Sequence, residues 1–485
     1  LGAVVGGWIG SGLLKAKLPE QVGVGFRIVA LGLLAVGRIL PIHIGIALGL
    51  FPGFTLGVVL VLAGGVTAVL LPRSTRWTRG PTAGLVAGWL LFYACFAAVT
   101  WYKAGPSAAH CASVIEGSSA PVLLDRFGEG GEYLDVEPYD VLPLADPGAV
   151  LVSFKRINRH GGFLEVLQLD DPKQRTRLRT WKKSADRTPG ARKRLGRSEA
   201  DRNRELQSGD GIPLWPERLE ADPRSGLVYA QLLGTEDYAI WEIQVETPAG
   251  GGGPAAQVRR KLPIRWEPGN PAIDSARRKL VLSFVPNREA DNPLLESIDL
   301  RSFQEAGGTP KPGPRLEMAD YAAADPATGH YYVPAFYDNA RFALAEVDGD
   351  SLEILRQRET YFATVGLAAD GARDRLYLTN VLAGGLYVLR QLDFSTRQVL
   401  PAGRFPRDLV LDRRRQRLYV GGYGDGIVRA YSLGGEEVRQ DYELSVGPLL
   451  RGVGLDPQSG RVFAASACGV FEVAGPQGQA PVLQR

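Results

Sequence analysis

The chain has 485 residues, of which 45% are hydrophobic and 22% are charged, a composition that is ordinary for a folded protein. Three cysteines are too few for a disulfide-rich scaffold or a Cys₄ zinc site, and no CxxC pair supports thioredoxin-like chemistry or c-type haem attachment. The net charge of +4 hides one basic segment. Residues 172–204 hold thirteen Lys/Arg and three Asp/Glu, a balance of +10, so the rest of the chain sums to −6.

Apolar runs dominate the first 102 residues. Residues 22–40, 44–71 and 83–102 each provide the roughly twenty mostly apolar residues that a bilayer-spanning helix needs, and residues 1–14 resemble the remainder of a fourth helix. A cleaved signal peptide is a poor explanation, because the apolar runs repeat. The sequence therefore predicts an N-terminal α-helical transmembrane segment.

Basic residues in the connecting loops indicate the orientation of these helices. Lys15 and Lys17 lie between the first two runs, and residues 73–80, RSTRWTRG, lie between the last two. Because Lys and Arg favour the cytoplasmic side, the last helix is expected to leave the membrane outward. We therefore expect a multi-pass protein of the inner cell membrane whose chain after Tyr102 is periplasmic.

Residues 103–139 are expected to form a linker, and residues 140–485 a β domain in which one motif recurs. In the last copy, GVGLDPQSGRVFAAS at residues 452–466, an apolar run ends in Asp, a turn follows, and an aromatic residue stands seven positions after the Asp. The anchor aspartates are Asp222, Asp274, Asp325, Asp370, Asp412 and Asp456, and the residues seven positions later are Tyr229, Val281, Tyr332, Tyr377, Tyr419 and Phe463. A degenerate seventh copy is anchored on Asp146.

The chemistry of the motif explains this pattern. Asp at a strand end accepts hydrogen bonds from backbone amides two residues on, while Pro and Gly supply the turn dihedrals. The aromatic residue then returns on the second strand and is expected to pack against the neighbouring sheet. Three or four short antiparallel strands in every 40–50 residues indicate one propeller blade per repeat. Seven copies predict a seven-bladed all-β propeller, with six or eight blades as alternatives, closed by a strand from residues 120–137 or from the tail 480–485.

Two stretches carry a family resemblance. LYLTN at residues 376–380 resembles the signature of YVTN-type repeats, and LDPQSGRVF at residues 455–463 resembles their D-P-x-x-G step. The resemblance extends to NHL and wider WD40-like propellers and covers roughly residues 140–480. It implies the propeller fold and leaves function open, because propellers host many unrelated activities.

Candidate ligand-binding residues come from the loops that such propellers use for binding. Four charged residues stand five positions before an anchor aspartate, which places them near the mouth of the central channel: Glu217, Asp320, Arg407 and Arg451. His160 and Asn380 come from loops between second and third strands. Opposed charges at one mouth suit a charged or zwitterionic ligand, and they equally suit a structural ring of ion pairs.

The basic insert at residues 172–204 has two interpretations. Its thirteen cations and Trp181 suit a polyanion or anionic lipid. Its Arg, Pro, Gly and Ser content equally suits a solvated, disordered loop. Nucleic acid is not expected as a partner outside the cytoplasm.

Cys111 follows the expected membrane exit, and Cys468 lies in the last repeat. In an oxidising compartment these two cysteines are able to pair and tie the beginning of the ring to its end.

The preferred function is therefore a membrane-anchored periplasmic propeller that binds a partner protein or an envelope ligand without catalysis. No His, Cys and Asp cluster has metal-ligand spacing, and no G-x-S-x-G elbow or P-loop occurs, so neither a metal nor a cofactor is expected. Two alternatives remain. The fold resembles lactonase-like propellers, which implies a calcium-dependent hydrolase or lyase. Glycines at every fourth position from Gly45 to Gly57 suit helix packing in an accessory subunit of a membrane complex.

Overall fold

A computed structural model of the chain divides it into two compact units, residues 1–105 and 106–485. All the residues that the structure describes belong to the second unit. They are 111, 122–126, 136–145, 148–156, 161–172, 175–180, 214–234, 237–247, 253–265, 267–284, 295–308, 316–319, 321–337, 342–360 and 364–475. None of the helices in these ranges is long and apolar enough to cross a membrane. The apolar runs predicted to cross the membrane, at residues 1–14, 22–40, 44–71 and 83–102, lie outside the described residues.

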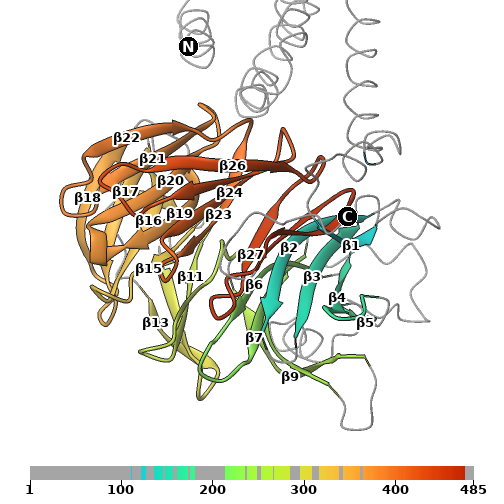
Figure 1. The fold of residues 1–485 in the computed structure, drawn as a ribbon. Helices are drawn as coiled ribbons and strands as arrows, with labels where there is room; N and C mark the ends of the chain where they lie inside the picture. Colours follow the sequence, from blue (N-terminus) through green and yellow to red (C-terminus); the bar gives the residue numbers. More distant parts are fainter. Residues whose placement is uncertain are drawn as a thin grey trace, which may run out of the picture. The chain divides into compact units, whose positions relative to one another are not determined.

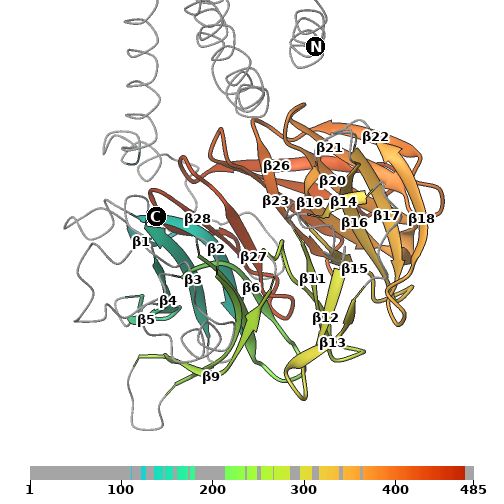
Figure 2. The same ribbon diagram turned by 180° about the vertical axis from the view of Figure 1, so that it is seen from behind.

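Seven antiparallel sheets follow one another along the chain and form a seven-bladed β-propeller, as the repeats predict (Figures 1 and 2). The first blade is β2 (Val136–Leu144), β3 (Ala149–Arg156), β4 (Gly162–Gln168) and β5 (Arg175–Arg179), and the second is β6 (Trp215–Ala221), β7 (Val228–Leu233), β8 (Tyr238–Glu246) and β9 (Ala255–Ile264). The third is β10 (Ala272–Asp274), β11 (Lys279–Ser283), β12 (Leu295–Asp299) and β13 (Gln304–Gly308). In the fourth, β14 (Leu316–Ala319) and β15 (Ala323–Ala324) both pair with β16 (His330–Tyr337), followed by β17 (Phe342–Asp348) and β18 (Ile354–Thr360).

The fifth blade is β19 (Thr364–Asp370), β20 (Arg375–Asn380), β21 (Gly385–Arg390) and β22 (Thr396–Pro401), with the short helix η1 (Gly371–Arg373) in its first turn. The sixth is β23 (Pro406–Asp412), β24 (Arg417–Gly422), β25 (Ile427–Ser432) and β26 (Arg439–Ser445). The seventh is β27 (Gly452–Leu455), β28 (Val462–Ser466) and β29 (Gly469–Ala474), completed by β1 (Val122–Arg126).

The ring closes through this N-terminal strand. β1 pairs antiparallel with β29 as the outermost strand of the seventh blade, with Val122 opposite Glu472 and Arg126 opposite Gly469. Of the two segments that the sequence offered for closure, residues 120–137 therefore provide the strand. The alternative tail, residues 480–485, lies outside the described residues.

Two expected boundaries shift. β2 begins at Val136, so the first blade starts before residue 140. The expected insert at residues 172–204 also contains a strand, because Arg175–Arg179 forms β5. There Arg177 is bonded to Glu165 and lies 4.1 Å from the centre of the Phe163 ring, so these first cations belong to the blade and not to a loop.

The anchor aspartates cap the turns between first and second strands. Asp456 accepts hydrogen bonds from the Gln458 amide, at 2.9 Å, and from the Ser459 hydroxyl, while the Gly460 amide donates to the Asp456 carbonyl. Gly460 has φ +81°, a value that favours glycine. Asp222 and Asp325 accept equivalent hydrogen bonds from Arg224, Ser225, Ala327 and Thr328. Each carboxylate thus satisfies turn donors, which is a structural role.

The residues seven positions after each anchor form the core between blades. Tyr229, Tyr332, Tyr377, Tyr419 and Phe463 are fully buried. Tyr332 packs with Leu376 and Leu378 of the following blade, and Phe463 packs with Val141 and Val150 of the first blade. Their burial explains why the aromatic recurs, since each blade needs a large apolar side chain to seal its contact with the next.

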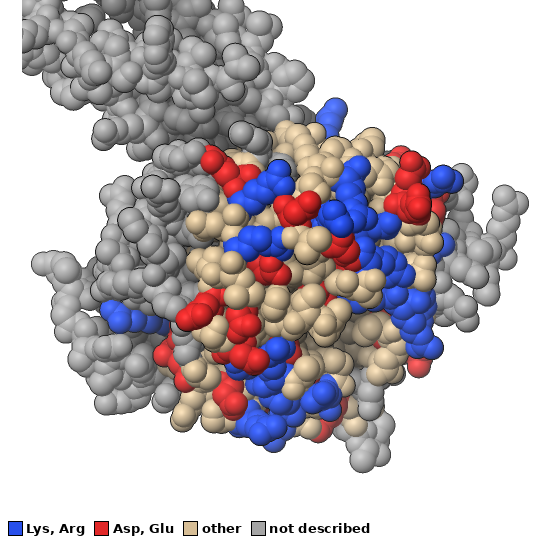
Figure 3. All heavy atoms as spheres, turned by 90° about the vertical axis from the view of Figure 1, so that its left-hand side faces the viewer, with Lys and Arg blue, Asp and Glu red and all other residues tan. Residues whose placement is uncertain are grey.

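Opposite three of these positions, and opposite Val152 of the first blade, a glutamate of the third strand bonds an arginine. The glutamates Glu165, Glu242, Glu346 and Glu472 lie across from Val152, Tyr229, Tyr332 and Phe463. Glu242 accepts from the Tyr229 hydroxyl at 3.2 Å and from Arg260 Nε at 2.7 Å. Acidic and basic side chains are also interspersed on the outer side of the propeller shown in Figure 3. Charged outer strands of this kind discourage edge-to-edge pairing with other chains.

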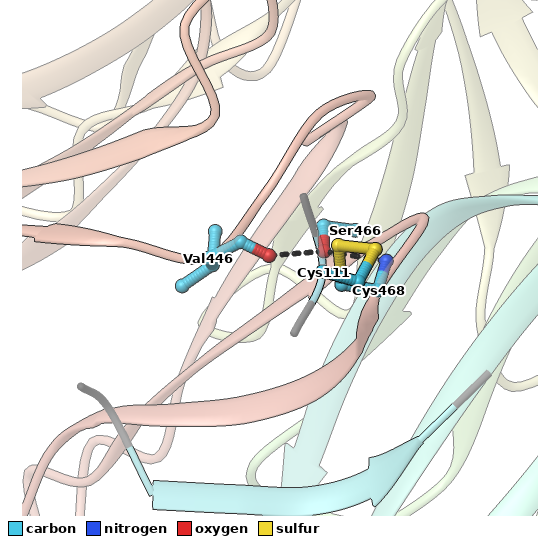
Figure 4. Close-up of a disulfide and its surroundings, with 4 residues drawn as sticks. All are labelled: Cys111, Val446, Ser466 and Cys468. Atoms are coloured by element: carbon cyan, nitrogen blue, oxygen red, sulfur yellow. Dashed lines mark hydrogen bonds between the residues drawn. A yellow bond between two sulfur atoms is a disulfide. The ribbon is translucent and has the colours of Figure 1, made fainter. Parts of the chain in front are cut away.

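A disulfide joins Cys111, eleven residues before β1, to Cys468 in the turn between β28 and β29, with the two Cα atoms 5.3 Å apart (Figure 4). This is the pair named from the sequence. Ser466 lies beside it, donating from its hydroxyl to the Val446 carbonyl and accepting from the Cys468 amide at 3.1 Å. The bond therefore fastens the chain just before the closing strand to the blade that this strand completes.

Candidate functional site

The inner strands share a bulge at the end where they begin, which we call the mouth end. The pairing register skips one residue between Pro216 and Arg218 in β6 and between Pro406 and Asp408 in β23. The same shift occurs between Pro138 and Asp140 in β2. The skipped residues are Glu217, Arg407 and Tyr139, and Arg451 immediately precedes β27. A bulge redirects a side chain, and here it brings these residues together at the mouth of the channel.

At the mouth, three cations alternate with three aromatic rings. Lys155 Nζ lies 4.2 Å from the centre of the Trp215 ring and 5.5 Å from that of Tyr139. The Arg451 guanidinium lies 4.2 Å from the Tyr139 ring and 5.0 Å from the Tyr423 ring, and that of Arg407 lies 6.0 Å from the Tyr423 ring. The order is therefore Trp215, Lys155, Tyr139, Arg451, Tyr423 and Arg407, contributed by the second, first, seventh and sixth blades. We call this set the cation–aromatic ladder.

Among the described residues, only the middle cation of the ladder forms an ion pair. Arg451 Nε donates to Glu137 Oε1, which also accepts from the Tyr423 hydroxyl at 3.5 Å. Within the described part of the chain, neither Lys155 nor Arg407 forms an ion pair. Glu217 lies near enough to raise the pKa of Tyr139, although it too forms no ion pair with a described residue.

Burial dominates the electrostatics of the ladder. It lowers the pKa of Lys155, to which Arg451 and Arg407 contribute repulsion, while Glu217 and Glu137 oppose the shift. Burial also raises the pKa of Tyr139 to about 12, so its hydroxyl stays protonated at neutral pH. The ladder therefore offers cations and neutral rings to whatever enters the mouth.

One residue further along the inner strands, a second network crosses the channel. Buried Arg218 of the second blade donates from Nη1 to Asp408 Oδ2 of the sixth, at 3.2 Å. Its Nε donates to Asn270 Oδ1 at 2.9 Å, its Nη2 donates to the Tyr321 hydroxyl at 3.0 Å, and Nη1 lies 3.6 Å from Asp140 Oδ1. Five blades thus meet at one guanidinium, which we call the Arg218 network.

Backbone amides complete the Arg218 network. Asp140 Oδ2 accepts from the Leu219 amide and Asp408 Oδ2 from the Val453 amide, each at 2.9 Å. Burial raises the pKa of Asp140 to about 7, against the opposing charge of Arg218. Burial also raises the pKa of Glu220, two residues along β6, to about 8, with Asp140 adding repulsion. The channel below the ladder is therefore crossed by an ion-pair network that joins opposite sides of the ring.

The ligand-binding residues predicted from the sequence lie in different places in the structure. Glu217, Arg407 and Arg451 gather at the mouth, where Arg451 forms an ion pair and lies between two rings. Asn380 is buried, and its amide oxygen accepts from the Leu382 and Ala383 amides, so it caps the turn after β20. His160 and Asp320 lie outside the described residues.

The sequence patterns did not single out Trp215, Tyr139 and Lys155 of the ladder or the Arg218 network. Arg218, Asn270, Tyr321 and Asp408 each stand four positions before an anchor aspartate, next to the position that was chosen. The same aligned repeats therefore contained the signal. Gly366 and Gly452 occupy this position in two other repeats; a Cβ on Gly452 would lie 2.6 Å from the Asp140 Cα, so the neighbouring inner strands approach too closely there for a side chain.

No group of His, Cys, Asp and Glu within the described ranges is arranged to hold a metal ion. The arrangement at the mouth supplies cation–π contacts, hydrogen-bond donors and the carboxylates of Glu137 and Glu217. Such a set recognises a charged surface with apolar parts.

No family model and no curated protein matches the chain. Among solved structures, hydrazine synthase of Kuenenia stuttgartiensis is similar with a TM-score of 0.50 and 9% identity, over 70% of this chain and 96% of that one. A chain of a mitotic checkpoint complex gives 0.45 at 10% identity, covering 69% of this chain and 87% of that one. A chain of a nidogen/laminin complex gives 0.38 at 15% identity, covering 61% and 94%. At 9% identity, the likeness to the hydrazine synthase chain shows a shared fold and nothing about activity.

Proposed function

We propose that this protein is a membrane-anchored propeller that binds a partner protein through its mouth end. The observation that carries the proposal is the cation–aromatic ladder, which collects Trp215, Tyr139, Tyr423 and Arg451 at one convergent site. Trp, Tyr and Arg dominate the binding energy of protein interfaces, because they combine large contact areas with directed polar groups. The rings are held by their own cations, so little conformational entropy remains to be lost on binding.

The Arg218 network supports a role in binding at one end of the ring. It joins the second blade to the sixth across the channel and occupies the space immediately beyond the ladder. A partner that reaches the mouth therefore meets a pre-formed surface with a closed floor. Pre-formed surfaces bind without a large ordering cost.

The membrane anchor and the periplasmic location rest on the sequence. The apolar runs before residue 103 have the length of spanning helices, and the basic loops favour an outward exit. The disulfide between Cys111 and Cys468 supports an oxidising compartment for the propeller, because disulfides persist there.

Site-specific photo-crosslinking in native membranes tests the proposal. A photo-reactive residue at Arg404, exposed in the loop before β23 at the mouth end, should capture a discrete partner. The same residue at Gln458, exposed in an anchor turn at the other end, serves as the control and should capture none. Replacing Tyr423 by Ala should reduce the yield at position 404. Equal capture from both ends, or capture unaffected by Y423A, would refute binding at the mouth.

Fractionation tests the anchor separately. The chain should stay in the membrane pellet after alkaline carbonate extraction, and protease added outside spheroplasts should degrade the propeller. Release by carbonate would contradict the anchor, and protection from protease in intact spheroplasts would contradict the outward orientation.

A further inference from the structure

The cations at the two ends of the cation–aromatic ladder form no ion pair with a described residue, although Glu217 attracts Lys155 from further away. Lys155 contacts Trp215 and Tyr139 through their rings, and Arg407 contacts Tyr423 in the same way. Neither cation has a carboxylate within ion-pair distance in the described part of the chain, whereas Arg451 between them is bonded to Glu137. Both end cations are half-buried.

A half-buried cation without an ion pair costs free energy, because aromatic rings replace only part of the water that it loses. That cost is visible in Lys155, whose pKa is lowered chiefly by burial; Glu217 opposes this shift, and Arg451 and Arg407 add to it. Arg407 is therefore close enough to Lys155 for their charges to repel. An anion placed near both would relieve the repulsion and supply the missing hydrogen-bond acceptors.

The residues around the two end cations indicate which class of anion fits between them. Tyr139 and Tyr423 present rings between the end cations, and Glu217 adds a negative charge to the same mouth. A highly charged phosphate would be repelled by Glu217 and would leave the rings uncovered. Carboxylates on short aliphatic arms carry less charge each and place methylene groups against the rings.

We propose that the ends of the ladder, Lys155 and Arg407, bind carboxylates of an acidic polypeptide segment. This assignment rests on the proposed function for the source of the segment, namely the partner protein. The aliphatic parts of its Asp or Glu side chains lie against Tyr139 and Tyr423, and its carboxylates replace the water lost by the two cations.

Chemical labelling of Lys155 in the full chain provides a direct readout. Amine acylation followed by mass spectrometry compares Lys155 with Lys279, whose ammonium donates to the carbonyls of Gly349 and Asp350. An oligoglutamate peptide should slow the labelling of Lys155 by about threefold or more and leave Lys279 unchanged. An oligoglutamine peptide and sodium chloride of equal ionic strength should have no effect.

Two further probes distinguish the source of the anion. If succinate protected Lys155 as strongly as oligoglutamate does, the site would bind a free dicarboxylate. That result would refute the proposal that a polypeptide segment is the ligand. Stronger protection by inorganic phosphate than by oligoglutamate would refute a carboxylate as the ligand. Equal labelling of Lys155 with and without every probe would overturn the site itself.

A matched pair of variants tests the second cation. Arg407→Gln should abolish most of the protection by oligoglutamate. Arg390→Gln removes an arginine that pairs with Asp374 in the first turn of the fifth blade, at the end away from the mouth, and it should leave protection intact. Protection that survives R407Q refutes the role of Arg407. If crosslinking at position 404 succeeds while oligoglutamate protects nothing, the partner binds by other contacts and only the acidic-segment assignment falls.

Discussion

The Arg218 network offers the sharpest test of how the ring is held together. Replacing Arg218 by Met keeps an unbranched, apolar side chain of similar length and removes the charge. Three side-chain hydrogen bonds disappear, those to Asn270, Asp408 and Tyr321, together with the ion contact to Asp140. The carboxylates of Asp140 and Asp408, from the first and sixth blades, are then left without this cation.

The expected size of the destabilisation follows from the burial of the three charged side chains. The Arg218 side chain is 10% exposed, and those of Asp140 and Asp408 are 8% and 13% exposed. Removing one partner of a buried ion pair costs about 3–5 kcal/mol, because the remaining charge is left uncompensated. We expect R218M to lower the free energy of unfolding by that amount. Arg390→Met, which breaks a pair whose side chains are 42% and 36% exposed, should cost at most about 1 kcal/mol.

The free energy of unfolding that R218M loses should also depend on pH in a defined direction. The pKa of Asp140 is raised from 3.8 to about 7, so folding favours its protonated form and wild-type stability from this group falls as pH rises from about 4 to about 7. Arg218 limits this rise, so R218M should raise the pKa of Asp140 above about 7. The variant then keeps losing stability above pH 7, where the wild type no longer does. One pH unit corresponds to about 1.4 kcal/mol, so the cost of R218M should be larger at about pH 8 than at about pH 5 by roughly that amount.

Equilibrium urea unfolding of the full chain in detergent, followed by tryptophan fluorescence at both pH values, measures these differences. The double variant R218M/D408N should recover part of the stability, because one unpaired carboxylate is removed with the cation. A role for Arg218 in holding the ring together would be refuted if R218M lowered the free energy of unfolding no more than R390M does. It would also be refuted if R218M lowered this free energy equally at both pH values.

Three further predictions concern the channel and the closure of the ring. Replacing Cys111 by Ser, or Cys468 by Ser, should lower the free energy of unfolding by about 2–5 kcal/mol. The double variant should lose no more than either single variant, and additive losses in urea unfolding would exclude the pairing of the two cysteines. Gly452→Ala should cost about 1–3 kcal/mol, because its Cβ would lie 2.8 Å from Asp140 Oδ1, whereas Gly475→Ala meets nothing within 4 Å and should be neutral in the same assay. Glu220→Gln should gain stability relative to wild type as pH rises from about 5 to about 8, because the pKa of Glu220 is raised from 4.5 to about 8 and the folded state resists its ionisation; parallel pH profiles would contradict this.

Much of the fold was determined by local sequence. Asp456 and Gly460 specify a turn through hydrogen bonds between near neighbours, and Phe463 specifies an apolar contact by its place in the alternation of a strand. Such features need only a few residues of context. Their recurrence therefore predicted the blades and their number before any tertiary contact was known.

The candidate site was determined only in part by the sequence. The offset of five from the anchor aspartate placed Glu217, Arg407 and Arg451 at the mouth, because equivalent strand positions lie at the same end of every blade. The offset alone did not separate a channel-mouth position from the network position one residue later, although Pro138, Pro216 and Pro406 directly precede the bulges that separate them. Tyr139 and Lys155 belong to the repeat with the poorest match and escaped the alignment.

Tertiary structure alone decided which residues meet. Arg218 and Asp408 are 190 positions apart, and Arg451 and Glu137 are 314 apart. These pairs form because the ring closes with seven blades and because β1, rather than the tail, completes the last one. A charged side chain on an inner strand has the same local sequence whether it faces water or a partner across the channel. Only the closed ring, which brings distant strands to one axis and removes water from between them, turns those charges into a network.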